Sequence, residues 1–249
     1  MELNTIYNEN CLETMARMPD GFVDVILTDL PYGTTSNKWD VAFDLESWWT
    51  EATRICKGAI ITTASQPFTS KIIMSNLSLF RHEWIWQKNA GSNFANTVRE
   101  PMKEHESVLV FAISKWTYNP QMQERAASGA ARVQTPVRFE TGSENYRQFD
   151  RVETKTMPTL RVPSSVQKFN RERGLHPTQK PLDLMEYLVN TYSNDNDLIY
   201  DCCCGSGTAL VAAHKLNRRW IGSETSAEYV ELANKRLEPY LNQGSLFGG

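Results

Sequence analysis

The stretch Asp201–Thr208 reads Asp-Cys-Cys-Cys-Gly-Ser-Gly-Thr and directly follows the apolar run Leu198–Tyr200. Short apolar runs of this kind are typical of buried parallel strands. Glycines just after such a strand let the backbone turn sharply and approach a ligand closely. In open α/β sheets, ligands bind beyond the carboxyl ends of the strands. The stretch therefore predicts an α/β sheet with a ligand site at the turn that holds Gly205 and Gly207.

Apolar runs alternate with segments of helical spacing on both sides of this stretch. The expected strands are Thr5–Tyr7, Val23–Asp29, Ala59–Ala64, Glu83–Trp86, Ser107–Ala112, Leu198–Asp201 and Arg219–Gly222. The expected helices are Cys11–Met18, Trp48–Cys56, Phe68–Leu77, Leu182–Tyr192, Ala209–Leu216 and Glu228–Leu241. Strands that alternate with helices favour a mostly parallel, doubly wound sheet.

The composition of the chain changes between Ser114 and Gly174, where the hydrophobic periodicity disappears and polar, Gly and Pro residues become more frequent. Residues 114–174 are therefore expected to form an irregular insert in a domain made of residues 1–113 and 175–249. Residues 115–180 hold twelve Lys and Arg against six Asp and Glu, although the whole chain has a net charge of −3. A basic insert on an acidic body indicates a local contact with a polyanion, and a merely solvated polar face is the open alternative.

Composition excludes several classes of protein. The 249 residues are 41% hydrophobic and 22% charged, which is ordinary globular usage and rules out a disordered or collagenous chain. The sequence shows neither an apolar stretch of about 20 residues nor a secretory signal at its start. Five cysteines, three of them consecutive, are expected to be reduced thiols in the cytoplasm. Adjacent cysteines cannot all point at one ion, so no metal site is expected.

A second polar cluster, Asp29-Leu30-Pro31-Tyr32-Gly33, also follows a buried strand. Asp29 and the Leu30 carbonyl can each accept a hydrogen bond, Pro31 fixes the backbone, and Tyr32 offers a flat face for stacking. The cluster suits a planar heterocycle with an exocyclic amino group, and a simple loop turn is the alternative. Glu224, just past the strand at Arg219–Gly222, is placed to accept hydrogen bonds from ribose hydroxyls.

Together and in this order, these motifs resemble a known family. Asp29–Tyr32 is similar to the Asp-Pro-Pro-Tyr motif of DNA amino-methyltransferases, and Asp201–Thr208 resembles their S-adenosylmethionine loop, usually Asp-Pro-Phe-x-Gly-Ser-Gly-Thr. His176–Pro181 resembles the motif that precedes this loop in the β-ordered group of the family. The match continues at Gly222–Glu224, Tyr229, Ala233 and Arg236–Leu237. The resemblance covers most of residues 1–113 and 175–241.

The resemblance implies a Rossmann-like methyltransferase sheet, circularly permuted because the catalytic strand comes early and the cofactor strand late. It implies S-adenosylmethionine as methyl donor, double-stranded DNA as substrate, base flipping, and a place in restriction–modification. The implied catalytic residues are Asp29, Leu30, Pro31 and Tyr32. The implied cofactor-binding residues are Asn10, Asp29, Lys180, Asp201, Cys203, Gly205, Ser206, Gly207, Thr208 and Glu224.

Three positions depart from the family pattern. Leu30 replaces the first proline of the catalytic motif, where only a carbonyl is required. Cys202 and Cys203 replace Pro and Phe, so the aromatic residue that lies against the cofactor in the family is a smaller thiol. Asn10 stands where many members have an acidic residue close to the cofactor adenine.

The insert is the expected target-recognition region, because arginines can contact both phosphates and guanines. The candidate DNA-binding residues are Arg125, Arg132, Arg138, Arg147, Arg161, Lys168 and Arg171. The tail Gln243–Phe247 resembles the short peptide by which bacterial replication proteins bind the sliding clamp, with a disordered end as the alternative. A homodimer is left open, and the expected location is the bacterial cytoplasm at the nucleoid, for a protein encoded by a bacterium or a phage.

Asp in the first motif position favours adenine N6 as the target, because family members with this residue more often act on adenine. The alternatives are cytosine N4, an RNA or small-molecule methyltransferase, and a non-catalytic DNA-binding module. The last of these needs neither a cofactor turn nor an amino-group cluster, so binding of S-adenosylmethionine would separate it from the enzymes.

Overall fold

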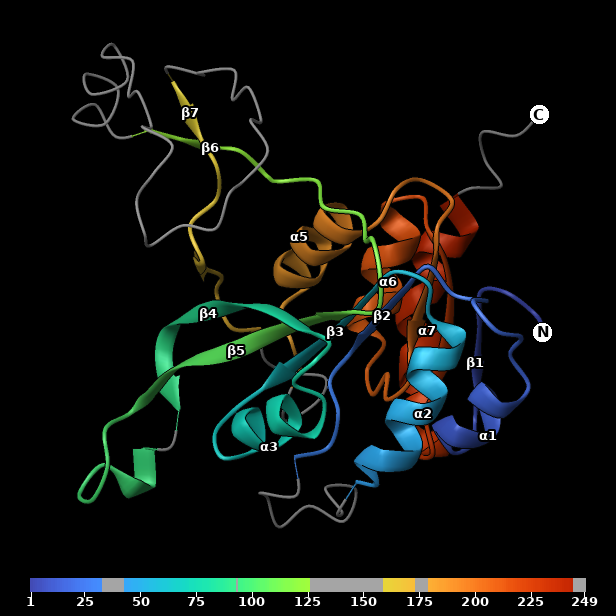
Figure 1. Ribbon diagram of the computed structural model, residues 1–249, viewed down its shortest axis with the longest axis horizontal. Coiled ribbons are helices and arrows are strands. Elements are labelled where there is room, and N and C mark those ends of the chain that lie inside the picture. The colour runs from blue at the N-terminus through green and yellow to red at the C-terminus, as the bar shows by residue number, and fades with distance from the viewer. Residues whose placement is uncertain (33–42, 93, 126–158, 173–178, 244–249) are drawn as a thin grey trace. The chain divides into compact units, whose positions relative to one another are not determined.

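A computed structural model of the protein describes residues 1–32, 43–92, 94–125, 159–172 and 179–243 (Figure 1). The chain divides into two compact units, Met1–Asn119 with Ser165–Gly249, and Pro120–Ser164. None of the helices in the described ranges is long and apolar enough to cross a lipid bilayer. The elements of the larger unit are β1 (Thr5–Tyr7), α1 (Cys11–Ala16), β2 (Val25–Thr28), α2 (Leu45–Ile55), β3 (Ala59–Ala64), α3 (Phe68–Ser75), β4 (Phe80–Ser92), η1 (Phe94–Asn96), β5 (Lys103–Ala112), β8 (Val166–Lys168), α5 (Leu182–Tyr192), β9 (Leu198–Asp201), α6 (Thr208–Lys215), β10 (Arg219–Ser223) and α7 (Ala227–Gln243).

These strands form one sheet in the order β1-β10-β9-β2-β3-β5-β4-β8. The five neighbouring strands β1, β10, β9, β2 and β3 are parallel, whereas β5 pairs antiparallel with both β3 and β4. Strand β9, late in the chain, lies beside β2, which is early, and β10 pairs with β1. The sheet thus has the doubly wound, mostly parallel arrangement and the permuted strand order that the motif order predicts.

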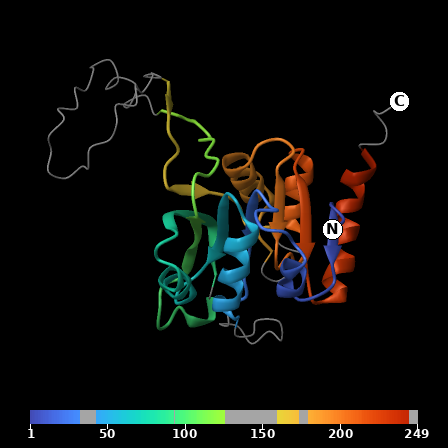
Figure 2. The ribbon, with the colours of Figure 1, turned by 45° about the vertical axis from the view of Figure 1, so that its right-hand side comes forward.

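Helices cover both faces of the sheet (Figure 2). Side chains alternate along a strand, and β2 is buried on both sides. Val25 and Leu27 pack in the cluster that contains Leu188 of α5, together with residues of α6 and α7. Ile26 belongs to the opposite cluster with Trp48 of α2, together with residues of α1 and α3. Burial on both faces explains why the central strands read as continuous apolar runs.

Two strands are much longer than the apolar runs predict. The expected strand Glu83–Trp86 is the middle of β4, and the expected strand Ser107–Ala112 is only the apolar half of β5. The additional residues are largely polar, and they pair as an antiparallel hairpin in the register Trp86↔Glu106 and Gln87↔His105. Backbone pairing, which needs no apolar side chains, extends the hairpin beyond the buried run.

The described part of the segment predicted to be irregular contains three short strands. In the smaller unit, β6 (Gln123–Glu124) pairs antiparallel with β7 (Leu160–Arg161). Strand β8 belongs to the larger unit, where it pairs with β4 at Trp86↔Gln167. These strands have two or three residues each, too few for a periodic pattern to appear in the sequence.

Candidate active site

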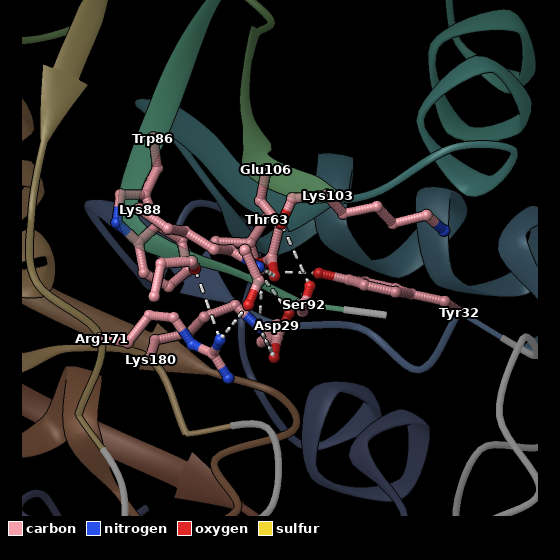
Figure 3. A network of polar contacts seen from close by, with 12 residues as sticks. Asp29, Tyr32, Thr63, Trp86, Lys88, Ser92, Lys103, Glu106, Arg171 and Lys180 are labelled. Atoms are coloured by element: carbon pink, nitrogen blue, oxygen red, sulfur yellow. Dashed lines mark hydrogen bonds and ion pairs between the residues drawn. The ribbon is translucent and has the colours of Figure 1, made fainter. Parts of the chain in front are cut away.

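Asp29 follows the last residue of β2 and is the centre of a polar network (Figure 3). Its Oδ1 accepts a hydrogen bond from the Tyr32 hydroxyl at 2.7 Å and a shorter one from the hydroxyl of Thr63 on β3. Its Oδ2 accepts from Nζ of Lys180 at 2.5 Å. Asp29 is therefore held by three donors from three separate parts of the chain, and its side chain remains 26% exposed.

Lys180, which precedes α5, connects Asp29 to a second carboxylate. Its Nζ lies 3.5 Å from Oε2 of Glu106 on β5, and the other oxygen of Glu106 is 2.5 Å from Nζ of Lys88 on β4. The side chains of Lys88 and Lys180 are only 6% and 7% exposed. Figure 3 shows the four charged groups converging from different strands and loops in the alternating order Lys88, Glu106, Lys180 and Asp29.

Opposite charges keep Lys180 and Glu106 ionised in spite of their burial. Burial opposes the ammonium of Lys180, but Asp29 and Glu106 outweigh it and raise the pKa of Lys180 above its ordinary value. Burial likewise opposes the carboxylate of Glu106, but Lys180 and Lys88 outweigh it and lower the pKa of Glu106. For Tyr32, burial and the negative charges of Asp29 and Glu106 raise the pKa well above its ordinary value, so the phenol stays neutral and can donate.

Tyr32 presents its ring between a packed face and the polar network. Phe68, at the start of α3, stacks on the ring with centroids 5.0 Å apart and planes inclined by 23°. Leu30 is buried in the core with Ile26 and Trp48, which anchors the loop that carries Asp29 and Tyr32. Nζ of Lys180 lies over the Tyr32 ring, 5.7 Å from its centroid, so the ring contacts the polar network as well as Phe68.

The glycine turn after β9 has the backbone geometry that its sequence predicts. Gly205 and Gly207 have φ values of 48° and 73°, in the left-handed region that favours glycine. A Cβ on Gly207 would lie 3.0 Å from Cβ of Ala233 on α7. The amide of Gly205 donates to the carboxylate of Glu224 at 3.0 Å, which ties the turn to the end of β10. The shape of the turn thus depends on glycine at these two positions.

The remaining predicted cofactor residues surround this turn. Asp201 ends β9 and accepts from the Cys203 amide at 3.2 Å. Ser206 and Thr208 are buried, and Nη1 of Arg236 on α7 donates to the Thr208 hydroxyl at 2.7 Å. Five of the predicted residues, Gly205, Ser206, Gly207, Thr208 and Glu224, therefore belong to one connected corner of the fold.

Asn10 and Cys203 belong to the α1 face of the sheet. Asn10 caps α1, because its side chain accepts from the Leu12 amide at 2.9 Å. Cys203 is half-buried and packs against the cluster that contains Cys11 and Cys202. The part of the chain that is described contains no group of three or more His, Cys, Asp or Glu side chains suited to hold a metal ion.

The catalytic loop and the glycine turn are neighbours. Strands β2 and β9 are parallel and adjacent, so the residues that follow them emerge at the same edge of the sheet. Cys202 contacts the Thr28 hydroxyl at 3.2 Å, which joins the two strand ends directly. Burial raises the pKa of Asp201 well above its ordinary value, and the charge of Asp29 adds to the shift. The glycine turn, the Glu224 carboxylate and Asp29 are thus gathered at one edge of the sheet, and the two carboxylates are acceptors suited to the hydroxyl and amino groups of a nucleoside with a charged tail.

The candidate DNA-binding residues fall into three groups. Arg125 and Arg161 belong to the smaller unit, where Nε of Arg125 donates to the Leu160 carbonyl at 2.7 Å. Lys168 ends β8, and Nη1 of Arg171 donates to the Gly91 carbonyl at 2.9 Å, beside the hairpin that carries Lys88. The other predicted residues, Arg132, Arg138 and Arg147, lie outside the described residues, as does the tail after Gln243.

Sequence reasoning missed Thr63, Phe68, Lys88 and Glu106, all of which belong to the network or the aromatic stack. Thr63 lies on β3 and Phe68 is the first residue of α3, and both elements were predicted only as parts of the core. Lys88 and Glu106 lie on the polar extensions of β4 and β5, beyond the apolar runs. The sequence shows a lysine and a glutamate of opposite charge at these positions, but it does not show that they lie next to each other. That follows only from the register in which β4 and β5 pair.

Comparison with known proteins decides the family. The model of the N6/N4 methyltransferases, described as DNA methylase, matches residues 23–235. The chain belongs to this family. Among curated relatives of this DNA methylase, the type II methyltransferase M.HpaI of Haemophilus parainfluenzae is 28% identical over 250 residues, which are 94% of the chain and 74% of the relative. The type II methyltransferase M1.MboII of Moraxella bovis is 27% identical over 259 residues, 94% of the chain and 96% of the relative.

Solved structures agree with the fold of the DNA methylase. The crystal structure of an M1.HpyAVI–SAM complex matches with a TM-score of 0.62 and 25% identity, over 94% of the chain and 99% of that protein. The cytosine-N4-specific PvuII DNA methyltransferase matches with a TM-score of 0.64 at 12% identity, over 98% and 93%, and shows the fold alone. These comparisons confirm the predicted family, the Rossmann-like sheet and S-adenosylmethionine as the methyl donor of the family.

Proposed function

We propose that this DNA methylase transfers a methyl group from S-adenosylmethionine to the N6 amino group of an adenine flipped out of double-stranded DNA. The observation that carries the proposal is the position of the Asp29 carboxylate. It lies beside the ring of Tyr32, and its strand is adjacent to the strand that carries the glycine turn. In this proposal, an acceptor for an amino group, a stacking surface and the cofactor site lie at one edge of the sheet.

The Asp29 carboxylate has capacity for the amino group. An ionised carboxylate offers about four lone-pair sites. Among the described residues, Tyr32, Thr63 and Lys180 use three of them. We infer that the fourth accepts one hydrogen of the amine and that the Leu30 carbonyl accepts the other. Two acceptors on an amine that is conjugated to a ring draw its nitrogen toward tetrahedral geometry and free its lone pair.

Bound S-adenosylmethionine supplies a methyl group that is already activated on a sulfonium, so the chain's own work is alignment. The glycine turn and Glu224 hold the donor, in this proposal, while Asp29 and Leu30 hold the amine. Asp29 also stabilises the positive charge that develops on the nitrogen. Lys180 keeps Asp29 oriented throughout, because its ammonium stays bound to Oδ2.

The target base cannot be reached inside a duplex, so it has to leave the stack, at a cost of about a few kcal/mol. In this proposal the flipped base stacks on the ring of Tyr32, which contributes about 1–3 kcal/mol. We propose that Arg125, Arg161, Lys168 and Arg171 contribute contacts to the DNA around it. The basic insert outside the described residues completes the recognition region in this proposal.

Cytosine N4 is the second candidate, because its amino group has the same two hydrogens. The solved fold is shared with a cytosine-N4-specific enzyme, so the fold does not separate the two bases. The presence of Asp at position 29 supports adenine by the resemblance described above. Identification of the methylated product separates the two bases.

Incubation of bacterial genomic DNA with isotopically labelled S-adenosylmethionine, followed by digestion to nucleosides and mass spectrometry, tests the proposal. We expect label in N6-methyladenine and none in N4-methylcytosine. Label in N4-methylcytosine would replace adenine by cytosine, and label in neither nucleoside would contradict DNA amino-methylation. An Asp29→Asn control, which should still bind the cofactor in calorimetry, shows that the label comes from this site.

Two partner assignments remain predictions of the sequence. The tail Gln243–Phe247 should bind the bacterial sliding clamp, and a pull-down with and without Leu246 and Phe247 tests this. Light scattering of the purified protein tests the homodimer. The relatives are proteins of bacteria, and we propose a location in the bacterial cytoplasm at the nucleoid.

A further inference from the structure

The ion pair between Lys88 and Glu106 is not accounted for by the motifs of the family or by the contacts of a flipped base. The two residues lie on neighbouring antiparallel strands, and the register Trp86↔Glu106 makes Lys88 the diagonal neighbour of Glu106 on the same face. Nζ of Lys88 also lies 5.1 Å from the ring centroid of Trp86. The pair is thus fixed by the hairpin itself, independently of the loop that carries Asp29.

Stability alone is a weak reason for such a pair. Two charges with 6% and 16% exposed side chains have lost most of their hydration. Replacing a buried ion pair by apolar residues of similar volume is often neutral or stabilising. The hairpin already packs through Trp84, Trp86 and Val108, which are buried apolar residues. The charges therefore call for a second explanation.

The geometry directs the pair toward Lys180. One oxygen of Glu106 is bound by Lys88, and the other faces Nζ of Lys180 at 3.5 Å without a hydrogen bond to any described group. Lys180 in turn makes its shorter contact, at 2.5 Å, with Asp29. Glu106 thus attracts the lysine from one side while Asp29 binds it on the other. The rigid hairpin sets where the ammonium stands, and the ammonium sets how the carboxylate of Asp29 is turned.

We propose that Lys88 and Glu106 are positioning residues for methyl transfer, which hold Lys180 against Asp29 so that the Asp29 carboxylate faces the target amine. The inference rests on the proposed role of Asp29 and deepens it. Neither residue touches the substrate in this account. Their effect reaches the reaction only through the ammonium of Lys180.

The charged and titratable groups around Lys180 define the pH dependence. They are Asp29 after β2, Tyr32 in the following loop, Lys88 on β4 and Glu106 on β5. With both lysines present, the pKa of Glu106 lies below its ordinary value of 4.5. Loss of Lys88 removes one of the two cations that lower it, so Glu106 becomes protonated at a higher pH. The acid limb of kcat should then move to higher pH.

The test compares Lys88→Met, Lys88→Arg, Glu106→Gln and the double variant Lys88→Met with Glu106→Gln, in methylation of DNA by the full-length protein. We expect kcat to fall by about 10- to 100-fold in Lys88→Met and Glu106→Gln, the size of effect that misplacement of a reacting group produces. KM for DNA and the Kd for S-adenosylmethionine should change little, because neither residue touches a ligand. Lys88→Arg should restore most of kcat and the wild-type acid limb.

The double variant guards against a mere folding defect, because it leaves no unpaired charge between the two positions. It should fold, yet its kcat should stay as low as that of Glu106→Gln. The matched control is Lys215→Met, which removes a lysine from the ion pair with Glu186 on α5, outside the site. This control should leave kcat and the acid limb unchanged.

A double variant with wild-type kcat, or a Lys88→Met variant with an unmoved acid limb, would overturn the inference. Failure of the proposed function has a different signature. If the wild-type protein methylated neither adenine nor cytosine in DNA, the account of Asp29 itself would fall. If the wild-type protein methylated adenine and the variants did so equally well, only the role of Lys88 and Glu106 would fall.

Discussion

The two halves of the site are built by different physical means. The half that follows β9 depends on backbone shape, with two glycines of positive φ, amide donors and close packing against α7. The half that follows β2 depends on charge, with four alternating ionic groups drawn from strands and loops far apart in the sequence. A cradle for a donor needs fixed walls, whereas a centre that stabilises a developing positive charge needs an oriented carboxylate. Substitutions in the two halves should therefore have different consequences.

Removing the charge at the centre of the ionic half should have the largest effect. In Asp29→Asn, the amine loses its charged acceptor and Lys180 loses its closer partner. We expect kcat to fall by about 10²- to 10³-fold, the loss typical of a single electrostatic stabiliser. The Kd for S-adenosylmethionine should be nearly unchanged. Single-turnover kinetics and calorimetry measure the two quantities, and wild-type turnover would remove Asp29 from the mechanism.

A side chain added to the glycine turn should instead lower the affinity for S-adenosylmethionine. In Gly207→Ala, the left-handed backbone costs about 1–2 kcal/mol for a residue with a Cβ, and the new Cβ meets Ala233 at 3.0 Å. If the turn relaxes to relieve this strain, cofactor binding has to restore it, and the affinity should fall roughly tenfold.

Gly21→Ala is the matched control for Gly207→Ala. Gly21 has a φ of 59°, but its nearest neighbour for a Cβ is Lys57 at 4.0 Å, away from the site. This variant should lose stability in a denaturant titration and keep its affinity for S-adenosylmethionine. Equal affinities for the two variants would contradict a cofactor role of the glycine turn.

Tyr32 contacts both the ionic network and the proposed base, and two substitutions separate its roles. Tyr32→Ala removes a stacking contribution of about 1–3 kcal/mol, which corresponds to roughly a 5- to 150-fold loss. Tyr32→Phe keeps the ring and removes the hydroxyl that contacts Asp29 and Thr63, of which the hydrogen bond to the carboxylate is worth about 1.5–3 kcal/mol. Fluorescence of DNA with 2-aminopurine at the target should show less base flipping in Tyr32→Ala than in Tyr32→Phe. The reverse order would argue against stacking on this ring.

Asn10 should give the smallest effect. Its observed role is to cap α1, and Asn10→Ala should lower the free energy of unfolding by about 1 kcal/mol. Asn10→Asp keeps a good cap and should restore that stability. If the cofactor affinity of both variants equals that of the wild type, Asn10 is a structural residue and not a cofactor residue.

The same contrast explains what the sequence could predict. The backbone half lies in one contiguous stretch, so glycine spacing after an apolar strand was enough to find Asp201–Thr208. The central strands were also predictable, because burial on both faces leaves continuous apolar runs such as Ala59–Ala64. In the ionic half, Asp29 was found because Pro31 and Tyr32 stand beside it.

The partners of Asp29 could not be predicted in the same way. Thr63, Glu106 and Lys180 are separated from it by 34 or more positions. The pairing of β2, β3 and β5 brings Thr63 and Glu106 close to it, and Lys180 comes from the segment before α5. Lys88 and Glu106 lie where side chains stop being apolar but backbone pairing continues. Lys180 was expected near the cofactor from its motif, and the structure shows its ammonium on the carboxylate of Asp29.

The most direct test of the account is a crystal structure of the protein with S-adenosylhomocysteine and a duplex that contains its methylated site. The account predicts a flipped adenine stacked on Tyr32, with N6 within hydrogen-bonding distance of Asp29 and the Leu30 carbonyl, and the cofactor in the turn of Gly205 and Gly207. A base or a cofactor bound at another edge of the sheet, too far from Asp29 for its amine to meet the donor, would contradict it.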